Sequence, residues 1–98
     1  MISREDIVGL CGLTEEELDA VAEHEHAPDV AAAALAAYLL GSPGGALRIV
    51  EMIRDDIRDA LARGDRAHAG ELFSVLRRFL LEHREACAER MAGLHPRR

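Results

Sequence analysis

The sequence predicts an all-α protein, and its composition supports this fold class in two ways. Ala and Leu supply most of the apolar residues, whereas the β-branched residues Val and Ile are few and scattered. Aromatic residues are also few, because the 98 residues include one Tyr, two Phe and no Trp. Strong helix formers therefore dominate, and little material is present for strands. A chain of this length suits one domain, residues 1–98, with a single core.

Capping residues predict where the first two helices begin. Ser3 precedes a short N-terminal helix, in which Asp6 takes the reciprocal position and which Gly12 ends. Thr14 precedes the second helix, and Glu17 three residues later completes a capping box. Both helices are thus predicted from side chains that satisfy backbone N–H groups at a helix start.

Pro28 separates the second helix from the third. The residue before a proline disfavours α geometry, so the second helix is expected to end near residues 25–26. The third helix is predicted to run from Pro28 to Leu40, and it is apolar on most sides. We therefore expect it to form the buried centre, where a large residue in place of Ala34 would overpack the core.

The second half of the sequence predicts two long helices. After the turn at residues 41–45, Ser42 is the expected cap of a fourth helix that continues to Arg63. Gly64 ends this helix, and Asp65 caps a fifth helix that is predicted to extend to about Ala92. The short turn makes the two helices antiparallel neighbours, and the longer fifth helix should overhang its partner.

These elements predict a compact bundle of four main helices plus a short N-terminal helix. The fourth and fifth helices form a long C-terminal antiparallel helical hairpin, and residues 93–98 are expected to be a frayed tail.

Charge is distributed unevenly along the chain. Residues 1–40 contain nine acidic residues and one basic residue, whereas residues 41–98 contain nine acidic and eleven basic residues. The stretch from Ile2 to Val21 superficially resembles a helix-turn-helix, but its second helix would present four acidic side chains to phosphates. We therefore expect no nucleic acid as a partner.

The cluster from Glu23 to His26 is the strongest candidate for chemistry. Two interpretations remain open. The imidazoles of His24 and His26 suit a helix C-terminus, where they favour the helix dipole and bond the last carbonyls. Alternatively, Glu23, His24 and His26 bind a transition metal, which requires the chain to unwind before Pro28 because both imidazoles cannot converge on one helix.

A second pair of metal-ligating residues, His83 and Cys87, has i, i+4 spacing on the fifth helix. Both residues lie on the apolar stripe of that helix, so we expect them to fill the core. Cys11 is the only other cysteine. Two distant thiols without a visible secretory leader predict a cytoplasmic protein, and no apolar run is long enough for a membrane span.

The segments LTEEE (13–17), AEHEH (22–26) and AYLL (37–40) resemble a group of small, all-helical bacterial proteins. The resemblance continues near residues 54–57 and 63–65, and it would cover most of the chain. It implies a standalone bacterial helical protein, with no activity attached.

No nucleophile motif surrounds any of the three Ser residues or the single Thr. The sequence therefore favours a non-enzymatic protein-interaction module, a homodimer or the partner of another protein. The alternative is a metal- or cofactor-binding helical protein that uses the cluster from Glu23 to His26.

Overall fold

The computed structural model describes residues 3–88, which are helical throughout apart from short connections. The helices are α1 (Arg4–Cys11), α2 (Glu15–Glu25), α3 (Asp29–Leu40), α4 (Gly45–Ala62) and α5 (Arg66–Glu82), followed by a helical segment at residues 84–88. The predicted all-α class is confirmed for these residues, among which no strand occurs. The predicted frayed tail, residues 93–98, lies outside the described part of the chain.

The predicted capping boxes at the starts of α1 and α2 are present. The hydroxyl of Ser3 accepts a hydrogen bond from the backbone N–H of Asp6, and the Asp6 carboxylate accepts one from the Ser3 N–H. Thr14 and Glu17 form the same reciprocal pair at distances of 3.1 and 3.0 Å. Each box satisfies two backbone donors that the helix itself leaves unpaired.

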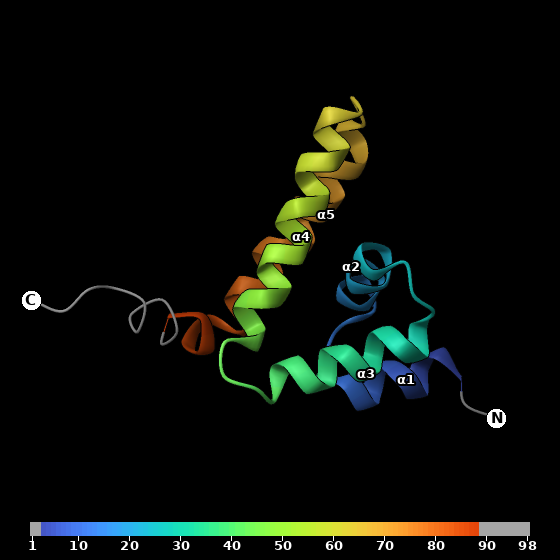
Figure 1. Ribbon diagram of the computed structural model, residues 1–98, viewed down its shortest axis with the longest axis vertical. Coiled ribbons are helices and arrows are strands. Elements are labelled where there is room, and N and C mark those ends of the chain that lie inside the picture. Colours follow the sequence, from blue (N-terminus) through green and yellow to red (C-terminus); the bar gives the residue numbers. More distant parts are fainter. Residues whose placement is uncertain (1–2, 89–98) are drawn as a thin grey trace, which may run out of the picture.

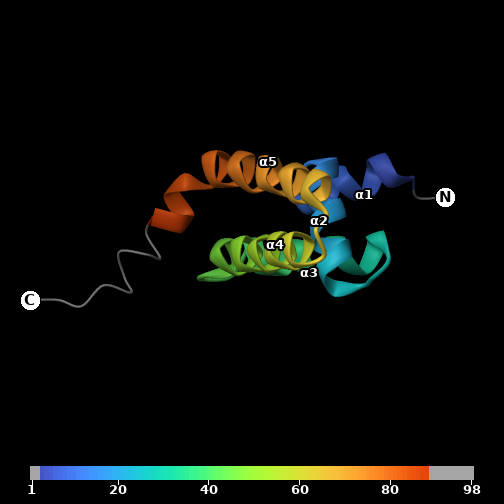
Figure 2. The ribbon, with the colours of Figure 1, turned by 90° about the horizontal axis from the view of Figure 1, so that it is seen from above.

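Two groups of helices meet at one end of the molecule. α4 and α5 lie side by side in both views, and the short turn at residues 63–65 connects them (Figure 1, Figure 2). α1 and α3 lie together across one end of this pair, and α2 lies in the angle between the two groups (Figure 1). α2 therefore contacts α3, α4 and α5 at once.

The core lies where α2 meets α4 and α5. Its largest fully buried apolar side chains come from these three helices: Leu18, Val21, Ile49, Ile53 and Phe79. Burying such side chains stabilises the fold by roughly 1.5–3 kcal/mol each. This packing holds α2 against α5 and so determines which polar residues of the two helices face each other.

The prediction that the third helix is the buried centre is wrong. Only one face of α3 is buried, through Ala32, Ala33 and Ala36, whereas Ala34 on the opposite face is exposed. An alanine-rich helix is apolar all round, so its sequence does not show which side faces the core. Small alanine side chains also expose little apolar surface when they face water.

The prediction that the fifth helix extends to about Ala92 is also wrong. α5 ends at Glu82, and His83 has φ −119° and ψ 32° before the helical segment at residues 84–88 begins. α4 has 18 residues and α5 has 17, so their lengths match and α5 has no overhang. No Gly or Pro precedes the break, which explains why the sequence did not reveal it.

The turn between α3 and α4 differs from the prediction in its capping residue. Gly44, with φ 78°, occupies the N-cap position of α4, and no side chain caps this helix. The hydroxyl of Ser42 instead donates to the carbonyl oxygen of Tyr38 at 2.7 Å. The backbone of Gly45 approaches Leu39 so closely that no side chain fits there.

None of the helices in residues 3–88 combines the length and the apolar character that crossing a membrane requires.

Candidate functional site

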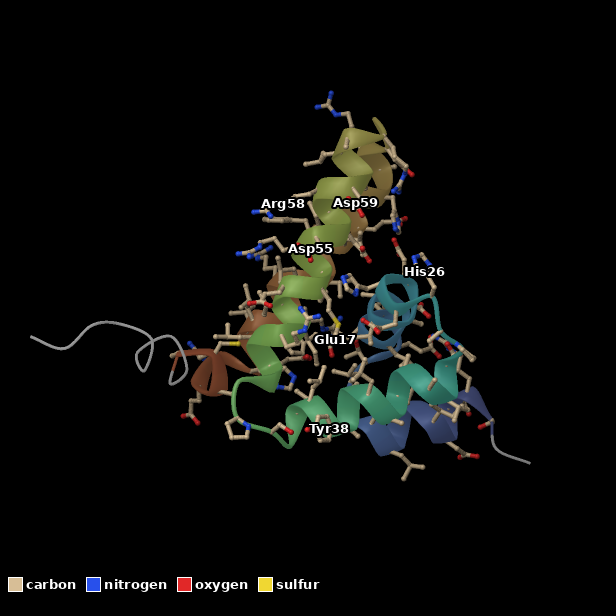
Figure 3. All side chains as sticks on the ribbon, in the orientation of Figure 1. Glu17, His26, Tyr38, Asp55, Arg58 and Asp59 are labelled. Atoms are coloured by element: carbon tan, nitrogen blue, oxygen red, sulfur yellow. The ribbon has the colours of Figure 1, made fainter. Side chains whose placement is uncertain are left out.

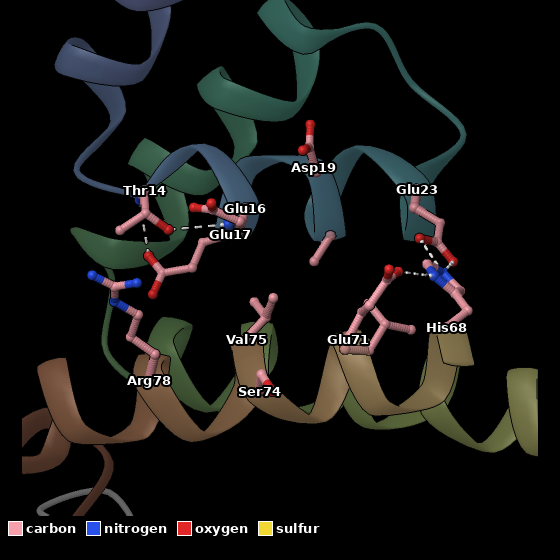
Figure 4. Close-up of a pocket in the computed structure, with 12 residues that line it drawn as sticks. Thr14, Glu16, Glu17, Asp19, Glu23, His68, Glu71, Ser74, Val75 and Arg78 are labelled. Atoms are coloured by element: carbon pink, nitrogen blue, oxygen red, sulfur yellow. Dashed lines mark hydrogen bonds and ion pairs between the residues drawn. The ribbon is translucent and has the colours of Figure 1, made fainter. Parts of the chain in front are cut away.

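A groove of about 510 Å³ lies between α2 and α5 (Figure 4). Its α2 side carries acidic residues, and its α5 side carries His68, Glu71 and Arg78. Leu72 and Val75 supply apolar surface at the floor. The groove therefore combines apolar surface with carboxylates, an imidazole and a guanidinium, and its chemistry differs between its two ends.

The outer end of the groove, near the C-terminus of α2 and the N-terminus of α5, contains a histidine between two carboxylates. His68 Nε2 lies 2.9 Å from the carboxylate of Glu23, and His68 Nδ1 lies 3.1 Å from Glu71 Oε1 (Figure 4). Because both ring nitrogens face an acceptor, the protonated imidazole donates to both carboxylates. The hydrogen bonds with Glu23 and then Glu71 raise the pKa of His68 above its ordinary value.

The inner end of the groove contains a buried carboxyl group. Glu17 is only 1% exposed, and its Oε1 accepts the capping hydrogen bond from the N–H of Thr14. Its Oε2 is buried and has no hydrogen-bond partner among the described residues. Burial, followed by the hydrogen bond that the protonated carboxyl group makes with Glu82, raises the pKa of Glu17 to about 7, whereas the ionised carboxylate lacks this bond. Glu17 is thus a buried acid that is half satisfied.

Two side chains from the end of α5 approach Glu17. Glu82 is the last residue of α5, and His83 follows at the break. Single ligand atoms of Glu17, Glu82 and His83 all lie within 4.8 Å of one another. The ring of His83 stacks on Phe79 with a centroid separation of 4.2 Å, which fixes its orientation. Arg78 Nε lies 3.6 Å from Glu82 Oε2 at the solvent-facing side.

The predicted metal residues point toward different parts of the molecule. Glu23 contacts His68 on α5. His24 Nδ1 lies 3.0 Å from Glu25 Oε2, and His24 Nε2 lies 3.8 Å from Asp55 Oδ2 on α4. His26 is exposed and has a left-handed backbone conformation with φ 53° at the C-terminus of α2 (Figure 3). The structure does not bring Glu23, His24 and His26 together as ligands, and a metal at these residues stays a prediction.

The backbone of His26 caps α2, whereas the sequence suggested that the imidazoles of His24 and His26 would bond the last carbonyls. The N–H of His26 donates to the carbonyl oxygens of Ala22 and Glu23, which ends α2. A backbone φ of 53° is uncommon for residues other than Gly, although His adopts it more often than most, as do Asn and Asp. The chain turns here toward Pro28, the N-cap residue of α3.

The partly buried carboxylate of Asp56 on α4 lies near His24 of α2. Asp56 Oδ2 is buried without a hydrogen-bond partner among residues 3–88, and burial raises the pKa of Asp56. The nearby charge of His24 acts in the opposite direction and favours the ionised carboxylate. The charge of His24 therefore partly offsets the effect of burial on Asp56 across the α2–α4 contact.

Both cysteines are buried free thiols. Burial raises the pKa of Cys87, which disfavours its reactive thiolate. His83, by contrast, is only partly buried and faces Glu17.

Glu17 and Glu82 were not predicted as site residues from the sequence. A signal for Glu17 was present, because it precedes Val21 by four residues and thus lies on the apolar stripe of α2. An acid on such a stripe is buried when the helix packs. No comparable signal marks Glu82, because its position depends on the unexpected break at His83.

Comparisons with models of protein families, with curated proteins and with solved structures give no match to this chain.

Proposed function

We propose that this protein is a non-enzymatic helical interaction module that forms a homodimer through the outer face of α1 and α3. Ile7, Leu10, Val30, Ala34 and Ala37 line one apolar hollow on this face, and we include the exposed Tyr38 of α3 in it. The observation that carries the proposal is its exposure: Leu10 is 80% exposed, Tyr38 70% and Val30 63%. Large apolar side chains grouped on one face favour protein association, because burying them removes apolar surface from water.

The charge pattern of α3 favours a second copy as the partner. No charged residue occurs between Val30 and Leu40. A two-fold dimer places the same surface on both sides of the interface, so a charge near the axis would meet its own copy. The outer face of α3 avoids this repulsion, and its alanines allow two helices to approach closely.

A second exposed apolar strip, on α5, is less suited to such a dimer. It contains Phe73, which is 60% exposed, together with Leu80 and Leu81. Arg77 and Arg84 line the same strip, and a two-fold contact would bring these arginines near their own copies. The α5 strip therefore provides a matched control surface of similar exposure.

Three hydroxyl groups have structural roles, which favours a role without catalysis. Ser3 and Thr14 accept capping hydrogen bonds, and Ser42 donates to a backbone carbonyl. The exposed acidic side chains of α2, including Glu16 and Asp19, are unfavourable for binding nucleic acid. We further propose that α4 and α5 form an antiparallel hairpin that is the frame of the fold. We also propose that the protein is bacterial and that it is cytoplasmic. Its free thiols favour the cytoplasm, because cytosolic proteins keep their cysteines reduced.

Sedimentation velocity over a concentration series tests the dimer. Leu10→Glu and Tyr38→Glu each add a charge to the proposed interface, whereas Phe73→Glu adds one to the α5 strip. The wild type and Phe73→Glu are expected to sediment as dimers, and the two interface variants as monomers with unchanged circular dichroism. A wild type that stays monomeric at every concentration, or a dimer that only Phe73→Glu dissociates, contradicts the proposal.

A further inference from the structure

Three ligand atoms lie close together where Glu17 borders the groove between α2 and α5. They belong to Glu17, Glu82 and His83, and each lies within 4.8 Å of the other two. Among residues 3–88, this is the one set of three carboxylate, imidazole or thiol groups whose ligand atoms lie close enough together to hold one metal ion. Carboxylate oxygens and imidazole nitrogens are both among the atoms that bind zinc in proteins.

The buried oxygen of Glu17 is the independent sign of a ligand. Glu17 is 99% buried, yet its Oε2 has no hydrogen-bond partner among the described residues. Burying a carboxylate oxygen without a partner is costly, so native structures rarely leave one unpaired. The hydrogen bond from the N–H of Thr14 occupies Oε1, and a carboxylate oxygen of Glu17 lies within 4.8 Å of ligand atoms of both Glu82 and His83.

The break in α5 makes the convergence of Glu82 and His83 feasible. Adjacent residues of a continuous helix point about 100° apart, so they rarely ligate the same ion. α5 stops at Glu82, and the non-helical ψ of 32° at His83 changes the direction of the chain. Stacking against Phe79 then holds the imidazole, as supporting contacts commonly do for metal ligands.

We propose that Glu17, Glu82 and His83 bind one divalent first-row transition-metal ion, for which Zn²⁺ is the probe. Three protein ligands leave a fourth tetrahedral position for water. The imidazole favours Zn²⁺ over Mg²⁺ and Ca²⁺, which prefer oxygen ligands alone. This site differs from the one predicted at Glu23, His24 and His26.

Arg78 opposes the bound cation. Its guanidinium lies 3.6 Å from Glu82 Oε2, and both side chains are substantially exposed. The ion therefore competes with Arg78 for the Glu82 carboxylate. Removing this competing charge through Arg78→Gln should strengthen Zn²⁺ binding, an effect that a merely structural role of Arg78 would not produce.

Native mass spectrometry of the untagged full chain, combined with Zn²⁺ titration against a chromophoric chelator, tests the site. One Zn²⁺ per chain is expected. His83→Gln and Glu82→Gln should weaken binding by at least about tenfold. His24→Ala/His26→Ala should bind Zn²⁺ as the wild type does, and Mg²⁺ should not displace it.

Circular dichroism of each variant separates lost ligands from lost folding. Glu82 is partly exposed, so Glu82→Gln is expected to stay folded even if His83→Gln does not. Absence of Zn²⁺ from the wild type after titration overturns the proposal. Binding that disappears in His24→Ala/His26→Ala but persists in His83→Gln and Glu82→Gln overturns it as well.

Discussion

Glu17 at the start of α2 and Glu82 at the end of α5 place carboxyl oxygens within 4.8 Å of each other. Two carboxylates at this separation repel each other when both are ionised. A proton held between them removes the repulsion and supplies a partner for the buried Glu17. Without a bound cation, the stability of the fold therefore depends on whether this pair is protonated.

The first prediction concerns pH. The pKa of Glu17 rises from 4.5 to about 7, so the folded chain binds more protons than the unfolded chain between these values. Stability should therefore fall as pH rises through this window, by at most about 3 kcal/mol. Urea unfolding in the presence of a chelator at pH 5 and pH 8 measures the difference.

Glu17→Gln is the matched control for this pH dependence. The Gln side chain keeps an oxygen that accepts from the N–H of Thr14, but it has no proton to lose. The variant should be more stable than the wild type at pH 8 and should show a flatter profile between pH 5 and pH 8. Equal slopes for the two proteins would show that Glu17 ionises normally.

Much of the fold was predictable because helix ends have local chemical signatures. Ser3, Thr14 and Asp65 cap the predicted helices, and Gly12 and Gly64 take left-handed conformations where helices end. Such caps depend on residues three or four apart, which a sequence displays directly. The break at His83 has no such signature and depends on tertiary packing.

The candidate site was much less predictable, because its contacts join distant residues. Glu23 was recognisable as a polar candidate, but its partner His68 lies 45 residues further along the chain. The expected neighbours, His24 and His26, project elsewhere because successive helical residues point in different directions. Only the packing of α2 against α5 decides these pairings.

The second prediction concerns the ionisation of His68. Glu23→Gln replaces the carboxylate at 2.9 Å by a neutral amide, so the pKa of His68 should fall toward its ordinary value. NMR titration of the imidazole measures this change. Glu16→Gln, an acid lining the same groove without this contact, is the control and should leave the titration almost unchanged.

The exposed contact between Glu23 and His68 should contribute little to stability, about 0–1 kcal/mol. Because the pKa of His68 is raised in the folded chain, this contribution is complete below the ordinary pKa of 6.5 and disappears as pH rises through the folded value. Its loss in Glu23→Gln should therefore be visible at pH 5 and absent at pH 9. A large loss at pH 9 would indicate a different role for Glu23.

The third prediction tests which face of α3 is buried. Ala36 is 0% exposed, so Ala36→Leu should overpack the contact with neighbouring helices and cost about 1–3 kcal/mol. Ala34 faces outward, so Ala34→Leu should change the free energy of unfolding of the monomer by less than about 0.5 kcal/mol. Thermal unfolding at low protein concentration compares the two variants, and a reversed order would place Ala34 inside.

The fourth prediction concerns the junction of α3 and α4, where Gly45 packs against the backbone of Leu39. A Cβ atom at Gly45 would lie 1.5 Å from the carbonyl oxygen of Leu39, so Gly45→Ala forces the two helices apart. We expect a loss of about 3 kcal/mol or more, at the upper end of overpacking costs.

Gly70→Ala is the matched control within α5, where a Cβ meets nothing within 4 Å. This control should stabilise the protein by roughly 0.5–1 kcal/mol through its higher helix propensity. Chemical denaturation compares both variants with the wild type, and a neutral Gly45→Ala would mean that α3 and α4 are not in close contact at this junction.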